Sequence, residues 1–170
     1  MPAIENELNE LGTRITKKFN LTGKVRLSIF LPVRTGVLRW RLQMVCKTKN
    51  IDKRELEASF ILKEGGIGYT FLKASEYHVE FVDTSNRSKF PSTYVTLSSV
   101  NQNLIDTGIK AIMVVAAFQE NSILGLLAVD TDEILDLEKM KTNNVHQLVL
   151  SWIIDRRKII RLLWRMKNNV

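Results

Sequence analysis

The stretch Ile109–Glu133, IKAIMVVAAFQENSILGLLAVDTDE, decides the fold of this chain of 170 residues. It contains two apolar runs, Ala111–Phe118 and Ile123–Val129, on either side of a four-residue polar turn. Short apolar runs bounded by turn residues are typical of buried strands. Two such strands predict an antiparallel hairpin at the centre of a β-sheet. Asp130 and Glu133 then have the spacing of a capping box, which predicts that a helix follows the second strand.

The composition is that of an ordinary globular chain, with 45% apolar and 25% charged residues. No apolar run approaches the ~18 residues that a membrane span needs, and the acidic, periodic N-terminus is unlike a signal peptide. A single cysteine, Cys46, excludes an internal disulfide and a cysteine-based zinc cluster. We therefore expect a cytoplasmic protein with one domain over residues 1–170. Its expected parts are an N-terminal helix at 1–20, a sheet–helix core at 21–140 and a C-terminal helix at 141–170.

The net charge of +7 is unevenly distributed. Residues 1–55 and 145–170 carry an excess of Lys and Arg, whereas residues 56–144 carry an excess of Asp and Glu. Such asymmetry is found in proteins that bind nucleic acid or anionic lipid. It is also found where basic ends are merely solvated or pair with an acidic middle, and we favour that interpretation.

Periodicity predicts the remaining elements. Residues 4–19 form one apolar stripe at helical spacing. Residues 24–33 and 37–47 alternate, which predicts a second hairpin with one wet face, on which Arg26 and Ser28 lie. The other predicted elements are helices at 51–63 and 67–74, a strand at 77–83, a polar loop at 84–103 with a short helix near 97–105, and a closing helix at 144–167.

The closing helix has an apolar seam that Arg156 interrupts once. Val149, Trp152, Ile159 and Leu163 belong to this seam. Roughly the opposite side of the helix is basic, with Arg157, Lys158, Arg161 and Arg165. The predicted fold class is therefore α+β, with a central antiparallel sheet of five to six strands flanked by helices and with long N- and C-terminal helices packed together.

The order of these elements resembles a GAF domain, the small-molecule sensor fold related to PAS domains. Two stretches carry the resemblance. Leu62–Gly68 followed by Val79–Asp83 is similar to the family's glycine turn, helix and third strand, and Ile112–Asp130 is similar to its constant hairpin. The resemblance covers roughly residues 5–165. It implies a non-enzymatic sensory or regulatory module whose ligand lies between the sheet and a covering layer at residues 67–105.

The position of that covering layer suggests which side chains face the ligand. Aromatic and hydroxyl groups with one carboxylate suit a small, partly apolar ligand. For each aromatic residue, plain core packing is the alternative. The candidate ligand-binding residues are Phe71, Phe81, Asp83, Tyr94, Thr96 and Ser98.

GAF domains commonly pair through their terminal helices, so the resemblance also implies a homodimer, here through residues 4–19 and 145–166. A small molecule or an effector protein is the other expected partner. Two alternatives stay open. The basic closing helix is also suited to an anionic membrane or a nucleic acid, and a GAF fold with a filled pocket acts only as an interaction scaffold.

The sequence contains no recognisable catalytic constellation. The glycine turn lacks the Lys-Ser/Thr pair of a phosphate loop, and His78 and His146 have no neighbours at metal-ligand spacing. Cys46 falls on an apolar strand face with Met44, which favours an inert thiol. The methionine sulfoxide reductases of the GAF family need several cysteines, and this chain has one. We therefore predict no enzymatic activity, no cofactor and no metal.

Overall fold

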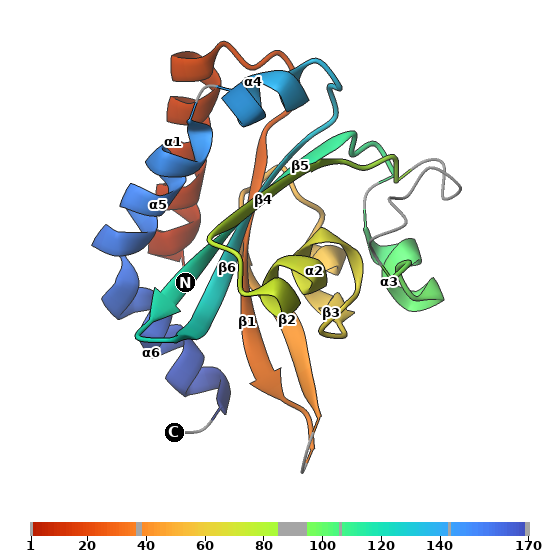
Figure 1. The fold of residues 1–170 in the computed structure, drawn as a ribbon, viewed down its shortest axis with the longest axis vertical. Helices are drawn as coiled ribbons and strands as arrows, with labels where there is room; N and C mark the ends of the chain where they lie inside the picture. Colours follow the sequence, from red (N-terminus) through yellow and green to blue (C-terminus); the bar gives the residue numbers. More distant parts are fainter. Residues whose placement is uncertain (1, 37–38, 85–94, 106, 143, 169–170) are drawn as a thin grey trace.

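The chain folds around a six-stranded antiparallel sheet (Figure 1). The computed structural model describes residues 2–36, 39–84, 95–105, 107–142 and 144–168. The strand order is β3-β2-β1-β6-β5-β4, which confirms the predicted α+β class. The strands are β1 (Arg26–Arg34), β2 (Trp40–Lys47), β3 (Ser59–Phe60), β4 (Tyr77–Phe81), β5 (Ala111–Gln119) and β6 (Ser122–Thr131).

Helices cover both faces of this sheet (Figure 1). One face carries α1 (Pro2–Phe19), α4 (Asp136–Thr142), α5 (Val145–Asp155) and α6 (Arg157–Asn168). The other face carries a short 3₁₀ helix, η1 (Lys53–Glu57), with α2 (Gly65–Lys73) and α3 (Ser99–Leu104). Among the described residues, no helix combines the length and the apolarity that crossing a membrane requires.

Strand β1 is buried on both of its faces. Leu27 and Ile29 join the core under α1 and α5, whereas Phe30 joins the core under α2. Arg26 and Ser28 are only 3% and 2% exposed. The predicted wet face is therefore wrong for this strand, because a second helical layer covers the side that the alternation leaves polar.

The central hairpin is confirmed as β5 and β6, which pair along almost their whole length. Its turn is shorter than predicted, because only Glu120 and Asn121 lie between the strands, with Glu120 at a φ of 55°. The middle of the sheet is occupied by β1 and β6. A Cβ at Gly125 would lie 2.8 Å from Leu31 Cδ2 and 3.1 Å from the Phe30 carbonyl oxygen, so the β1–β6 contact requires a glycine there.

The segment predicted as a helix at 51–63 has a different structure. Asp52 caps η1 by accepting a hydrogen bond from the Arg54 backbone N–H at 2.8 Å. The chain then extends into β3, where Phe60 pairs with Leu42 of β2 and packs edge-on against Phe30, with ring centroids 5.5 Å apart. The apolar residues of this segment therefore meet the sheet as a strand does, which overrides their helical spacing.

A β-bulge in β2 changes which way its last residues point. Ile29 pairs with Cys46, but the next residue of β1 pairs with Met44, so Val45 is the extra residue. Cys46 consequently lies in the core under α1, and Met44 lies in the core on the opposite face. The prediction that Cys46 and Met44 share one face of the strand is therefore wrong, although the thiol is buried as expected. Desolvation by burial raises the pKa of Cys46, which keeps the thiol protonated and unreactive.

The N- and C-terminal helices pack together, as predicted, through the core that α1 and α5 share on one face of the sheet. The prediction of one uninterrupted closing helix at 144–167 is wrong, however. It is interrupted at Arg156, which has φ and ψ of −105° and 9°. The Arg156 guanidinium forms an ion pair with Glu7 of α1, so the interruption coincides with a contact between the terminal helices.

Asp136 connects the residues that precede β1 to the last residue of β6. Its buried carboxylate accepts hydrogen bonds from the backbone N–H groups of Thr22 and Gly23, both at 2.9 Å, and from the Thr131 hydroxyl at 3.1 Å. Burial alone would raise the pKa of Asp136, but these hydrogen bonds and Lys139 outweigh burial and lower it. The carboxylate thus stays ionised while it holds the α1–β1 turn against the β6–α4 connection.

Candidate functional site

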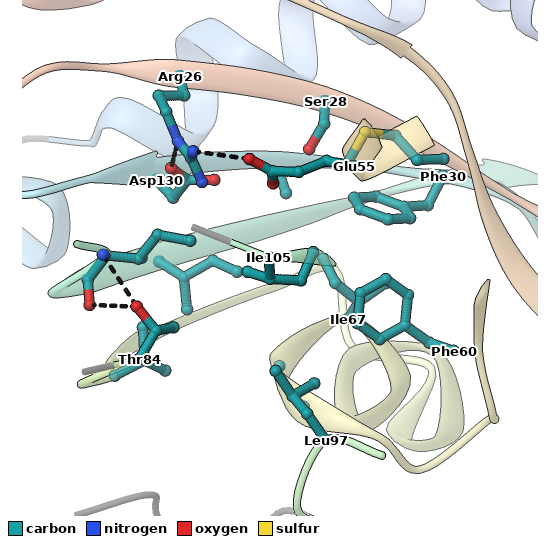
Figure 2. Close-up of a pocket in the computed structure, with 17 residues that line it drawn as sticks. Arg26, Ser28, Phe30, Glu55, Phe60, Ile67, Thr84, Leu97, Ile105 and Asp130 are labelled. Carbon is teal, nitrogen blue, oxygen red and sulfur yellow. Dashed lines mark hydrogen bonds and ion pairs between the residues drawn. The ribbon is translucent and has the colours of Figure 1, made fainter. Parts of the chain in front are cut away.

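A pocket of about 60 Å³ lies between the sheet and the layer formed by η1, α2 and α3 (Figure 2). We call it the central pocket. One end is polar and charged, and the remainder is apolar. The lining residues are Arg26, Ser28, Phe30, Met44, Glu55, Phe60, Gly65, Gly66, Ile67, Val82, Thr84, Leu97, Ile105, Ile109, Ile112, Ala128 and Asp130.

A buried ion cluster forms the polar end of the pocket. Arg26 Nε lies 2.6 Å from Asp130 Oδ1, and Arg26 Nη1 lies 3.1 Å from Glu55 Oε1. The three side chains are between 3% and 7% exposed. Arg26 and Asp130 are direct cross-strand partners in β1 and β6, whereas Glu55 reaches them from η1. The cluster therefore connects the centre of the sheet to the layer that covers it.

Ser28 points into the pocket beside this cluster (Figure 2). It lies two residues after Arg26 on the same face of β1 and is 2% exposed. Its side chain borders the pocket volume directly. Thr84 lies on the far wall, where its hydroxyl exchanges hydrogen bonds with the backbone of Ile109 at 3.0 and 3.3 Å. The Ser28 hydroxyl therefore adds a short polar group to the wall next to the ion cluster.

Glu64 holds the cover of the pocket in place. Its carboxylate is buried and accepts hydrogen bonds from the Ser98 backbone N–H at 2.6 Å and from Asn101 Nδ2 at 2.8 Å. Gly65 follows with a φ of 60°, and a Cβ at Gly68 would lie within 2.8 Å of the preceding backbone. The glycine turn therefore starts α2 and lets it pack closely, in agreement with its expected structural role.

The two ligand-binding residues predicted at the end of β4 point away from this pocket. Val82 and Thr84 line it, whereas Phe81 and Asp83 do not. Successive residues of an extended chain point to opposite sides, so Phe81 faces the α5 side of the sheet. Asp83 forms an ion pair with Lys110, with 2.6 Å between Oδ1 and Nζ.

The other predicted ligand-binding residues lie elsewhere. Phe71 of α2 lines a separate groove at the end of the sheet. Ser98 is the N-cap of α3, and Thr96 is exposed on the surface. Tyr94 lies outside the described residues. The covering layer is thus where the resemblance implied, but of the six residues predicted to line the pocket, none that the structure describes does so.

Sequence reasoning missed the charged end of the pocket. Arg26 and Ser28 were assigned to a wet face, and Glu55 lay inside a segment expected to be helical. Asp130 was expected to cap a helix with Glu133, but it lies within β6 and pairs with Arg26, so that prediction is wrong. The pairing of β1 with β6 brings Arg26 and Asp130 together, and η1 adds Glu55 from the covering layer. No local pattern indicates either contact.

The predicted dimer seam is buried within a single chain. Val149, Trp152 and Leu163 belong to the core under α1, and Ile159 packs against its edge. Their apolar surface is therefore already covered by the sheet and α1. The basic residues are all exposed on α6, as their spacing predicted: Arg157, Lys158, Arg161 and Arg165.

No protein-family model matches the sequence, and no curated protein matches it either. Solved structures do resemble it. The type II free methionine-R-sulfoxide reductase from Thermoplasma acidophilum has a TM-score of 0.55 at 12% identity, over 96% of this chain and 94% of that one. The free methionine-R-sulfoxide reductase from Neisseria meningitidis has a TM-score of 0.50 at 11% identity, over 91% and 80%. The GAF domain of an Acinetobacter phosphoenolpyruvate-protein phosphotransferase has a TM-score of 0.48 at 15% identity, over 91% and 84%. The fold is GAF-like.

The prediction that the chain is not an enzyme is contradicted by these similarities. Free methionine-R-sulfoxide reductases are enzymes that share this GAF-like fold. The prediction rested on the lack of a local motif and on the presence of a single cysteine. The first ground is weak, because catalytic residues usually converge from distant segments of a chain. The central pocket itself illustrates this, because Arg26, Glu55 and Asp130 are far apart in sequence. In this GAF-like fold Cys46 lies on the opposite side of the sheet from that pocket.

Replacing Arg26 with methionine is expected to lower the free energy of unfolding by about 3–5 kcal/mol, because it removes the guanidinium from between two buried carboxylates. Urea denaturation at pH 7 measures this change. Arg54→Met is the matched control, since Arg54 pairs with Asp52 at the surface and is 76% exposed, and it should have little effect. Arg26→Lys, which keeps the charge and loses the fork geometry, should fall between the two. Equal stability of both methionine variants would contradict the structural role of the cluster.

Proposed function

We propose that this GAF-like chain is a regulatory module that binds a compact small molecule in the central pocket. The observation that carries the proposal is the buried ion cluster of Arg26, Glu55 and Asp130 at one end of the pocket. Beside it lies Ser28, which is buried and faces the pocket. Polar groups that converge at one end of an otherwise apolar pocket are what orients a small ligand.

The pocket's size and charge define the class of ligand. A volume of about 60 Å³ admits a molecule of only a few non-hydrogen atoms. Most of its wall is apolar, so most of the ligand is apolar too. Among the described lining residues, two carboxylates face one guanidinium, which favours a ligand that donates hydrogen bonds over an anion. We infer a short branched or cyclic hydrocarbon skeleton that carries one amine or hydroxyl group.

The fold supports a route from this pocket to the terminal helices. Arg26 and Ser28 present their side chains to the pocket, while Leu27 and Ile29 of the same strand pack under α1 and α5. A ligand that displaces β1 therefore also displaces the core on which the helices rest. Closely packed cores transmit small shifts in this way rather than absorbing them.

Isobutylamine, isobutanol and isobutyrate test the proposal because they share a skeleton and differ in their polar group. We expect the amine or the alcohol to raise the melting temperature of the protein in a saturable manner, and isobutyrate to leave it unchanged. Ala128→Val adds two methyl groups to the pocket wall. This variant should be more stable than the wild type by about 0.5–2 kcal/mol and should no longer respond to the probes.

Ala116→Val is the control for that variant. Ala116 lies on the same face of the sheet in β5 but does not line the pocket, so the added methyl groups overpack the core and destabilise it by about 1–3 kcal/mol. The response to the probes should persist in this control. If no probe stabilises the wild type, or if Ala128→Val responds as the wild type does, the proposed site is wrong.

We also propose that the chain forms a homodimer, through a surface different from the buried seam. Three large apolar side chains of α5 and α6 are exposed: Ile154 at 53%, Leu162 at 58% and Met166 at 64%. Exposed apolar side chains that gather on one pair of helices are typical of self-association. This surface supports signalling through the same helices that rest on the pocket strand.

The double variant Leu162→Glu/Met166→Glu should convert the dimer to a monomer, because it places two charges in an apolar contact. Light scattering coupled to size exclusion, at about 50 µM protein, measures the mass. Ser151→Glu, a change at an exposed position of α5, should leave the dimer intact. A wild type that elutes only as a monomer would rule out this proposal, and so would a dimer that survives the double substitution.

A further inference from the structure

A second hollow opens at the end of the sheet, where the start of β2, the β5–β6 turn, α2 and α6 approach one another. We call it the aromatic groove, and its volume is about 620 Å³. Three large aromatic side chains from three different elements line it: Trp40 of β2, Phe71 of α2 and Trp164 of α6. Trp40 is 40% exposed. Figure 1 shows α6 and the β1–β2 hairpin, which frame this end of the molecule.

Two arginines of α6 line the groove. Arg161 and Arg165 of α6 line it, and neither forms an ion pair with any described residue. Other arginines differ in this respect, since Arg26 and Arg156 are both paired. Among the described residues that line the groove, Glu120 in the β5–β6 turn is the only acidic one. The lining therefore has a net positive charge.

The positive charge continues along α6 beyond the groove. Arg157 and Lys158 lie on the same exposed stripe as Arg161 and Arg165. From residue 157 to residue 165 the stripe spans about 12 Å of helix axis. This is longer than one phosphate group requires, so the surface suits a chain of phosphates better than a single one.

We propose that the aromatic groove binds single-stranded nucleic acid. Bases stack on Trp40 and Trp164, while Arg161 and Arg165 contact the phosphates and the rest of the stripe follows the backbone. Aromatic faces beside a continuous basic track are the general arrangement for binding single strands without sequence preference. Stacking tolerates any base, and arginine binds phosphate oxygens through its forked donors.

The shape of the surface argues against two other occupants. A bilayer is contacted by apolar side chains that project from a surface, whereas these aromatic rings line a hollow. An acidic peptide would satisfy the arginines but would leave the flat aromatic faces without a stacking partner. A nucleotide strand supplies planar rings and negative charge at a regular spacing, which matches both features.

Fluorescence anisotropy of labelled dT12 with the full chain tests the proposal, together with quenching of tryptophan fluorescence. We expect binding that weakens steeply as salt rises, accompanied by quenching. Arg161→Ala/Arg165→Ala should weaken binding at least tenfold and reduce the slope of log K against log salt by about 1.4. Trp40→Ala, at an exposed position, should weaken binding by about fivefold or more and remove part of the quenching.

Arg14→Ala/Lys17→Ala is the matched control, because it removes the same charge from exposed positions of α1 and should leave the affinity within about twofold of the wild type. Equal losses in the two double variants would overturn the proposal, since binding would then reflect net charge alone. Binding of thymidine monophosphate as tight as that of dT12 would overturn it, as would a lack of dT12 binding. Co-sedimentation with phosphatidylglycerol vesicles in place of dT12 binding would assign the surface to a membrane instead.

Discussion

The buried ion cluster of Arg26, Asp130 and Glu55 links the two central strands of the sheet to the layer that covers them. Three charges removed from water are tolerated only when they compensate one another in good geometry. Arg26 and Asp130 meet this condition across two adjacent central strands, which fixes the β1–β6 register. Glu55 meets it from η1 in the covering layer, which fixes η1 over the sheet. The cluster thus determines both the floor of the central pocket and part of its cover.

This constraint explains why the pocket is polar at one end and why the strand below it has two buried faces. A guanidinium held by carboxylates excludes apolar packing from its immediate surroundings, so the core under α2 closes around it incompletely. The Ser28 hydroxyl opens into the space that remains. On the reverse face, Leu27 and Ile29 complete the core beneath the terminal helices. One strand therefore carries the proposed ligand contacts on one side and the support of α1 and α5 on the other.

Local periodicity predicted those parts of the fold that depend on local sequence. The central hairpin, α1 and the glycine turn were identified correctly because each has an apolar pattern or a turn residue of its own. The failures share a different cause. The bulge at Val45 turned the Cys46 side chain to the other face of the sheet. At the end of β4 the prediction was off by one residue, so that Val82 and not Phe81 lines the pocket. The Arg26–Asp130 pair depends on the order of strands, which a single sequence without an alignment does not specify.

Methionine methyl groups report directly on whether a small molecule occupies the pocket above Arg26 and Ser28. Met44 lines the pocket, whereas Met113 and Met140 are fully buried on the opposite face of the sheet. In a protein labelled with ¹³C at the methionine methyl groups, NMR titration with isobutylamine measures all three at once. If the molecule binds there, the Met44 signal shifts in a saturable manner while the signals of Met113 and Met140 stay in place. A Met44 signal that does not move, or three signals that move together, would show that the pocket is not the binding site.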